Sequence, residues 1–309
     1  MNESSQNNQE IPLSLAFFTG FLCILFGSNA VAIKLTLTGL GAFTTAGFRF
    51  CMASLTIYIW ARITGRKIGF KKGQLHQLLI TSSLFTAQLG MFYLALSKTN
   101  ASRGTLLINT QPFFVLFLAH IFIPGDNITI KKLFGLVLGF MGMGLVFFGK
   151  EGVTSDIKIG DTMTVIAAFL WACNTTYSKR IINGFDPFLL VFYPMIFSIP
   201  FFFLAGFIWD GTMIYAIDLT VLGSLIYQAC ISGSLGFVAW INMLQKYGAV
   251  SLHSFLFIMP IAGVVLGGLV LGEAINLNII FSLLLIVLGI LTVNLKSGKY
   301  FQYFPTRGV

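Results

Sequence analysis

Long apolar runs separated by short polar segments follow one another along almost the whole chain. A membrane-spanning helix needs about 17 to 25 mainly apolar residues, and ten runs meet this requirement. They cover approximately residues 13–33, 42–62, 75–97, 102–123, 133–149, 162–179, 187–209, 219–243, 249–272 and 276–295. Among the Asp, Glu, Lys and Arg residues, only Arg49 falls well inside one of these runs. The pattern predicts an all-α membrane protein with ten transmembrane helices.

The rest of the chain is too short for a separate soluble domain. We expect a tail at residues 1–12, five helices within 13–150, five more within 160–295, and a second tail at 296–309. The first tail has no basic region, and no clear small-residue cleavage site follows it. The first helix should therefore stay in the membrane.

Composition excludes several other classes of protein. Of the 309 residues, 56% are hydrophobic and 9% are charged, whereas about a quarter of an ordinary soluble domain is charged. A globule with so few charges could not cover its surface in water. This excludes an ordinary soluble enzyme, a disordered chain and a nucleic-acid-binding domain. The four cysteines all lie in apolar stretches without a C-x-x-C pair, which indicates buried thiols and no disulfide or zinc framework.

Basic residues are distributed unevenly between alternate loops. If the N-terminus is inside, thirteen of the nineteen Lys and Arg residues lie in cytoplasmic segments and five in external ones, with Arg49 in the membrane. Cytoplasmic loops of membrane proteins carry an excess of Lys and Arg. The distribution predicts a multi-pass protein of the cell membrane, in bacteria the inner membrane, with both termini cytoplasmic.

The two halves of the chain resemble each other. Asn29 in the first span aligns with Asn174 in the sixth, and Pro112 in the fourth aligns with Pro260 in the ninth, at nearly the same offset. Because five helices is an odd number, the second half must cross the membrane in the opposite sense. Inverted repeats of this kind are typical of transporters with a substrate site near the midplane. The symmetry places Asn29 in the outer third of the membrane and Asn174 in the inner third.

Short motifs accompany the repeat: Phe26-Gly27-Ser28-Asn29 with Lys34, Phe48-Arg49-Phe50, Pro112, Trp171 with Ser178-Lys179-Arg180, and Pro260 with Gly272-Glu273. With these motifs and this helix count, the chain resembles the drug/metabolite transporter superfamily over about residues 13–295. Within that superfamily it is most similar to the ten-helix EamA family. One departure is Gly125-Asp126-Asn127, where the family often has Gly-Glu-Arg. The resemblance implies a metabolite exporter and not an enzyme, with a central cavity lined mostly by spans 1, 3, 4, 6, 8 and 9.

Polar residues inside the membrane are candidates for function because they are costly to place there. Asn29 and Asn174 are the strongest pair for substrate binding, since an amide both donates and accepts hydrogen bonds and so suits a zwitterion or polar head group. The alternative is that they join helices to each other. The further candidates for substrate binding are Gln88, Asn109, Trp171, Tyr227, Trp240 and His253. Trp171 lies one turn from Asn174 and shares its face, and His253 is a possible proton site.

Pro112 and Pro260 lie near the middle of their spans and predict hinges or kinks, because proline removes a backbone donor. A static kink satisfied by a neighbouring Ser or Thr is the alternative. Arg49 is a group that attracts an anionic substrate, or one whose long side chain reaches the outer surface. We favour a structural role for it, because span 2 should be peripheral.

All ten acidic residues lie in tails, loops or helix ends, which argues against a carboxylate proton relay and against an acidic site for a divalent metal ion. The sequence has no Walker loop and no dinucleotide fingerprint, and we expect no cofactor. The sequence predicts a secondary transporter that exports an amino acid or related amphipathic solute by alternating access. The alternatives are a carrier of nucleotide sugars or other phosphorylated solutes, a membrane-embedded enzyme and a passive channel. The expected partners are a small-molecule substrate and the lipid bilayer, with no nucleic acid, and the protein should be a monomer or homodimer.

Overall fold

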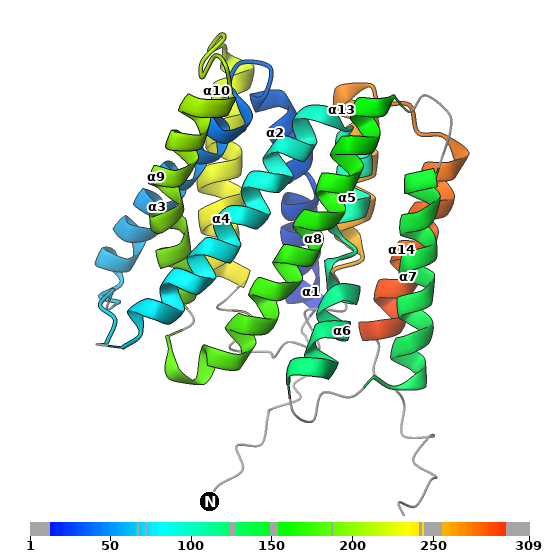
Figure 1. Ribbon diagram of the computed structural model, residues 1–309, viewed down its shortest axis with the longest axis horizontal. Helices are drawn as coiled ribbons and strands as arrows, with labels where there is room; N and C mark the ends of the chain where they lie inside the picture. Colours follow the sequence, from blue (N-terminus) through cyan, green and yellow to red (C-terminus); the bar gives the residue numbers. More distant parts are fainter. Residues whose placement is uncertain are drawn as a thin grey trace, which may run out of the picture.

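The computed structural model describes residues 13–66, 68–71, 73–123, 128–148, 154–186, 188–240, 243 and 255–294 (Figure 1). Within these ranges the regular elements are helices, with one isolated bridge between Leu40 and Ile214. The ten crossings of the bundle are α1 (Leu13–Gly27) with α2 (Asn29–Thr36), α3 (Ala42–Ile63), α4 (Leu75–Lys98), α5 (Ala101–Ile108) with α6 (Gln111–Phe122), α7 (Ile130–Phe148), α8 (Ser155–Ile181), α9 (Leu189–Trp209), α10 (Leu219–Ile226) with the π-helix η2 (Tyr227–Gly236), α13 (Ile258–Leu271) and α14 (Leu277–Asn294). A short 3-10 helix, η1 (Ile182–Gly184), follows α8. The predicted all-α fold with ten spans is confirmed.

Length and composition qualify seven of these stretches as membrane spans, and α13 and α14 are shorter apolar helices. The tenth stretch, α8, is long enough but is not among the seven. The predicted start of the sixth span at residue 162 is wrong, because α8 begins at Ser155. Two acids in its first turns have basic partners: Asp156 pairs with Lys98 at 3.7 Å, and Asp161 pairs with Arg103. A hydropathy pattern ends the predicted span at charged residues, whereas the helix itself continues through them because each charge has a partner.

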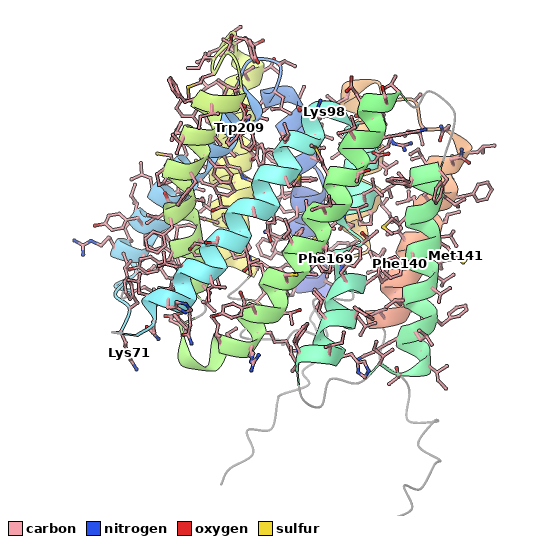
Figure 2. All side chains as sticks on the ribbon, in the orientation of Figure 1. Lys71, Lys98, Phe140, Met141, Phe169 and Trp209 are labelled. Atoms are coloured by element: carbon pink, nitrogen blue, oxygen red, sulfur yellow. The ribbon has the colours of Figure 1, made fainter. Side chains whose placement is uncertain are left out.

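Two helix pairs lie on opposite sides of the bundle (Figure 1). Helix α3 packs against α9 on one side, and α7 packs against α14 on the other. Each pair joins equivalent helices of the two repeats, namely the second and seventh spans and the fifth and tenth. Helices α7 and α14 approach closely because both have glycine where they meet: a Cβ on Gly135 would lie 2.8 Å from the carbonyl oxygen of Gly289. Met141, on the outer face of α7, is exposed as a lipid-facing side chain should be (Figure 2).

Equivalent helices run in opposite directions, as an inverted repeat requires. The last turns of α2 and α8, which carry Lys34 and Lys179, lie at opposite ends of the bundle (Figure 1). Lys71, ahead of α4, and Lys98, in the last turn of α4, likewise lie at opposite ends (Figure 2). The antiparallel arrangement of the repeats is therefore confirmed. Which end faces the cytoplasm stays a prediction.

The repeats differ in the regularity of their inner helices. The first span is broken at Ser28, between α1 and α2, whereas its equivalent α8 is one continuous helix of 27 residues. The third span, α4, is continuous over 24 residues, whereas its equivalent passes from α10 into the π-helix η2. The two irregular spans pack against each other, and the hydroxyl of Ser28 contacts that of Tyr227 where both irregularities begin. Breaks and π-helices of this kind occur frequently at functional sites.

Acidic residues that follow α9 and α13 cap helices of the other repeat. Asp210 accepts hydrogen bonds from the backbone N–H of Thr44 at 2.8 Å and from its hydroxyl at 2.7 Å, at the start of α3. Glu273 accepts from the N–H groups of Ala101 at 2.6 Å and Ser102 at 2.8 Å, at the start of α5. A carboxylate at a helix N-terminus satisfies free N–H groups and complements the helix dipole. These two caps hold the repeats together at one end of the bundle.

Candidate functional site

A chain of buried hydrogen bonds joins four spans between the repeats. Arg49 Nη1, on α3, donates to the Tyr93 hydroxyl on α4 at 2.9 Å, and Tyr93 donates to Gln228 Oε1 on η2 at 2.7 Å. Gln228 Nε2 then donates to Thr36 Oγ1 on α2 at 2.7 Å. All four side chains are buried. Buried polar networks of this kind fix the relative positions of the helices that carry them.

Arg49 is the charged end of this chain. Only 9% of it is exposed, so the predicted alternative of a side chain that reaches the outer surface is wrong. The hydroxyl of Tyr93 holds it inside the bundle, and its guanidinium lies 5.2 Å from the ring centroid of Phe50. No carboxylate of the described residues pairs with it, and its Nε is buried without a hydrogen-bond partner there. A buried cation without a counter-ion is unfavourable in a membrane interior.

Asn29 and Asn174 share an unusual property. In each, Oδ1 is buried and has no hydrogen-bond partner among the described residues. Asn29 is the first residue of α2, directly after the break, and Asn174 lies in α8 beside Thr175, whose hydroxyl accepts from Gln111 Nε2 of α6 at 3.2 Å. The two asparagines thus occupy equivalent positions in the repeats, and each leaves an acceptor without a donor.

Gln88 belongs to the same group, because its Oε1 is also buried without a partner in the described part of the chain. Asn109, in contrast, donates to the carbonyl oxygen of Thr105 at 2.8 Å within its own helix turn. The Tyr227 hydroxyl donates to the carbonyl oxygen of Leu25 at 2.9 Å, next to the break in the first span. These predicted residues therefore lie on inner spans, but they differ in whether the protein already satisfies them.

The predicted aromatic residues divide between two surroundings. Trp240 packs edge-to-face on Phe26 of α1, with ring centroids 5.9 Å apart. Trp171, on α8, has 43% of its surface exposed. His253, the remaining predicted residue, lies outside the described residues. The roles of these residues in binding stay predictions.

Both predicted prolines lie in the first turn of a helix. Pro112 is the second residue of α6, after a break at Asn109 and Thr110 that divides the fourth span. The hydroxyl of Thr110 donates to the carbonyl oxygen of Leu107 at 2.6 Å, which satisfies part of the broken ladder. Pro260 is the third residue of α13 and is buried. The position of each proline is thus compatible with a static break or a hinge, and movement at either stays a prediction.

Sequence reasoning missed the environment of Asp161. It is not in a loop or a helix end but in the second turn of α8, with 0% of its surface exposed. Arg103 pairs with it, Thr99 Oγ1 donates to its Oδ1 at 2.6 Å, and Arg103 Nη2 also donates to the carbonyl oxygen of Val146 at 2.5 Å. This buried ion pair joins the α4–α5 corner to α7 and α8. The sequence contained one signal for this ion pair: two opposite charges, Arg103 near the start of span 4 and Asp161 at the start of span 6.

The described residues form an antiparallel pair of helical repeats that bury amide oxygens and one unpaired arginine between them. These features are those of a multi-pass membrane transporter. The described residues contain no group of three or more His, Cys, Asp or Glu side chains that could hold a metal ion. A family model described as the EamA-like transporter family matches residues 14–148 and again residues 158–295. The chain belongs to the EamA-like transporter family, whose members are transporters and not enzymes.

Individual relatives agree with this assignment. The chain is 24% identical over 270 residues to an uncharacterized transporter, YoaV, of Bacillus subtilis, which covers 86% of this chain and 92% of that protein. It is 28% identical to a "probable amino-acid metabolite efflux pump" of Escherichia coli, over 81% of this chain and 84% of that one. A solved structure described only as the crystal structure of a protein superposes with a TM-score of 0.66 at 14% identity, over 90% and 96% of the two chains. That likeness supports the fold alone.

Proposed function

We propose that this protein exports an amino acid or a related small amphipathic solute by alternating access between its two repeats. The observation that carries the proposal is the pair of equivalent asparagines, Asn29 and Asn174, whose buried Oδ1 atoms have no donor among the described residues. Leaving a buried acceptor unsatisfied costs about 1–3 kcal/mol. A solute that donates hydrogen bonds to both amides removes this cost while it is bound.

The unsatisfied groups between the repeats are complementary to a zwitterion. The oxygens of Asn29, Gln88 and Asn174 require hydrogen-bond donors, and the guanidinium of Arg49 requires a negative charge. An amino acid has an ammonium group that supplies donors and a carboxylate that supplies the charge. The name of the Escherichia coli relative, an amino-acid metabolite efflux pump, points to the same class of solute.

The irregular spans supply a means of alternation. The break at Ser28 and the π-helix η2 lie against each other, whereas α4 and α8 form a continuous pair on the other side of the inner bundle. Inverted repeats alternate by rocking one bundle against the other around a fixed site. We therefore assign the moving surface to the α1–α2 and α10–η2 spans and the static one to α4 and α8.

The alternative of a phosphorylated solute is less well supported. A phosphate group requires several cations in its site. Of the buried basic side chains in the described interior, Arg103 is already paired with Asp161, and Arg49 is without a carboxylate. One unpaired arginine matches a single carboxylate better than a phosphate.

Counterflow in proteoliposomes tests the proposal. Purified protein is reconstituted and loaded with each of a panel of amino acids, amines and nucleotide sugars, with and without a pH gradient, and exchange of labelled solute is measured. We expect saturable exchange of one or more amino acids.

Asn174→Ala should lower that exchange about tenfold, since it removes an acceptor that only the solute satisfies. Asn278→Ala, in the first turn of the peripheral helix α14, is the matched control and should leave exchange unchanged. Exchange confined to nucleotide sugars, or normal exchange by Asn174→Ala, would contradict the proposal.

A further inference from the structure

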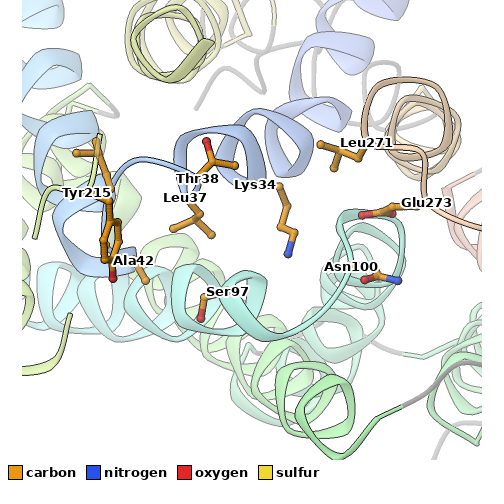
Figure 3. Close-up of a pocket in the computed structure, with 11 residues that line it drawn as sticks. Lys34, Leu37, Thr38, Ala42, Ser97, Asn100, Tyr215, Leu271 and Glu273 are labelled. Carbon is orange, nitrogen blue, oxygen red and sulfur yellow. The ribbon is translucent and has the colours of Figure 1, made fainter. Parts of the chain in front are cut away.

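A pocket of 460 Å³ opens between the repeats at the end of the bundle where Glu273 caps α5 (Figure 3). Its lining comes from four connections and the helix ends beside them, namely the connections between α2 and α3, α4 and α5, α9 and α10, and α13 and α14. The lining residues are Lys34, Leu37, Thr38, Leu40, Gly41, Ala42, Ser97, Asn100, Tyr215, Leu271 and Glu273. A volume of this size is within the range of about 300–1,000 Å³ that small-molecule sites have. The charge distribution of the loops predicts that this end of the bundle is external.

Lys34 is the cation of this pocket. Its side chain extends from the last turn of α2 toward the end of α4 and Asn100 (Figure 3). Nζ donates to the carbonyl oxygen of Leu96 at 3.0 Å, and an ammonium group has three N–H donors. Lys34 forms no ion pair with any of the described residues. The pocket therefore contains a positive charge with donors available for an anionic group.

The hydroxyl groups of the pocket are available only as acceptors. Ser97 donates its hydrogen to the carbonyl oxygen of Leu94 at 2.7 Å, and Thr38 donates to that of Leu35 at 2.8 Å. Tyr215 donates to the carbonyl oxygen of Asp210 at 3.2 Å. Since each hydroxyl has one hydrogen and two lone pairs, the lone pairs remain for a ligand. These three oxygens are suited to N–H groups of a ligand and not to a second anion.

Glu273 adds a negative charge beside these acceptors. Its Oε2 accepts from the N–H of Ser102 at 2.8 Å and from the Ser102 hydroxyl at 2.5 Å, whereas Oε1 accepts one hydrogen bond from the described residues, that of the Ala101 N–H at 2.6 Å. A carboxylate oxygen accepts about two hydrogen bonds, so Oε1 can take another donor. The carboxylate also disfavours a doubly charged anion at Lys34, because like charges repel strongly in a partly buried site.

Apart from the side-chain amide of Asn100, the remaining wall is mainly apolar (Figure 3). Leu37, Leu40 and Leu271 line the pocket together with the ring of Tyr215. The pocket thus combines one cation, several acceptors with a carboxylate, and an aliphatic surface. These are the three features that recognise the carboxylate, the ammonium and the side chain of an apolar amino acid.

We propose that this pocket binds a zwitterionic amino acid with an apolar side chain. Lys34 Nζ holds its carboxylate, Glu273 Oε1 accepts from its ammonium, and Leu37 and Leu271 contact its side chain. This site is separate from the asparagines of the bundle interior and lies at the predicted external mouth. The inference rests on the proposed function where it takes the bound amino acid to be the transported solute. The binding chemistry of the pocket follows from its lining residues alone.

Binding of three matched probes to the full-length chain tests this site. L-Leucine carries both charged groups, 4-methylpentanoate lacks the ammonium and 3-methylbutylamine lacks the carboxylate. A cysteine introduced at the exposed Ser97 by Ser97→Cys is labelled with a maleimide, with the wild-type chain as the blank for its native cysteines. We expect L-leucine to slow the labelling of Cys-substituted protein, with the two analogues about tenfold weaker, because each lacks one charge-assisted interaction. Equal protection by all three probes, or none by L-leucine, would overturn the proposal.

Variants of Lys34 identify the group that binds the carboxylate. In the Ser97→Cys background, Lys34→Met should weaken protection by L-leucine about tenfold or more, and Lys34→Arg should retain most of it because the charge is kept. Lys98→Met is the matched control, since Lys98 lies at the same end of the bundle but does not line the pocket. If Lys34→Met does not fold, weaker protection by 4-methylpentanoate than by L-leucine in the parent still supports recognition of a zwitterion. Unchanged protection in folded Lys34→Met overturns it.

The outcome is distinguishable from failure of the proposed function. Asn174→Ala in the Ser97→Cys background should retain protection by L-leucine, because the pocket does not include Asn174. Protection without any amino-acid counterflow supports the pocket and contradicts the proposed function. Counterflow that is normal while L-leucine gives no protection contradicts the pocket alone.

Discussion

The two inner helix pairs of this protein differ although they occupy equivalent places in an inverted repeat. On one side α4 and α8 are continuous helices, and the buried ion pair of Arg103 on α5 with Asp161 on α8 holds the corner between α4 and α5 against α8. On the other side the broken first span meets the π-helix η2 through the hydroxyls of Ser28 and Tyr227. A charged, buried pair fixes geometry strongly, whereas neutral hydroxyl contacts are individually weak. We therefore expect the pair of α4 and α8 to stay rigid during transport and the irregular pair to rearrange.

The largest expected effect is on the rigid pair. Asp161→Asn removes the counter-ion of Arg103 and leaves a buried cation, which should lower the free energy of unfolding by about 3–5 kcal/mol. Thermal denaturation of the detergent-purified protein measures this loss. The double variant Asp161→Leu with Arg103→Met removes both charges and should recover most of the stability. If Asp161→Asn unfolded at the wild-type temperature, the ion pair would not be what fixes α8.

Arg49→Met sharpens the contrast, because Arg49 is already without a carboxylate among the described residues. The variant loses one hydrogen bond to Tyr93, worth about 1 kcal/mol, but it also removes an uncompensated buried charge. We expect a melting temperature within a few degrees of wild type and an exchange rate lowered about tenfold or more, if Arg49 attracts the carboxylate of the solute. A collapse of stability as large as that of Asp161→Asn, or normal exchange, would show that Arg49 has a structural role alone.

The smallest expected effect concerns the irregular pair. Tyr227→Phe removes the hydrogen bond to the carbonyl oxygen of Leu25 and the contact with Ser28, and should cost about 1 kcal/mol of stability. Tyr193→Phe is the matched control, because Tyr193 also donates to a backbone carbonyl, that of Ile68, at 2.7 Å. Both variants should melt at similar temperatures, whereas only Tyr227→Phe should change the exchange rate several-fold. Equal exchange rates in the two variants would remove the irregular pair from the transport cycle.

Hydropathy alone predicts most of the fold. Apolar runs locate eight spans to within a few residues of their described helices, since each run must be long enough to cross the membrane. The ninth run was predicted to begin at residue 249, whereas α13 begins at Ile258. Hydropathy misplaces the start of α8, because the partners of Asp156 and Asp161 come from α4 and α5, which are distant in the sequence. The break at Ser28 had a local signal in the Gly27-Ser28 pair, and small residues such as Gly233 mark η2, but neither pattern specifies a π-helix.

The candidate site was predictable only in part. An intramembrane amide is visible in a sequence, so Asn29 and Asn174 could be named. Whether an amide is satisfied depends on neighbours from other helices: Asn109 bonds within its own turn, whereas Asn174 does not. Thr36 was missed although it follows Asn29 by two turns, because threonine is common in apolar helices. Arg49 was assigned to the periphery, since the sequence cannot show that Tyr93 holds it inside.

The central claim is that the two equivalent asparagines accept hydrogen bonds from the transported solute. Its most direct test is counterflow of the best-transported amino acid by a chain carrying both Asn29→Ala and Asn174→Ala, reconstituted at a matched amount of folded protein. Since each lost acceptor should lower exchange about tenfold, the account predicts a loss of about a hundredfold with a melting temperature no lower than that of the wild type. Exchange within twofold of the wild-type rate would contradict it.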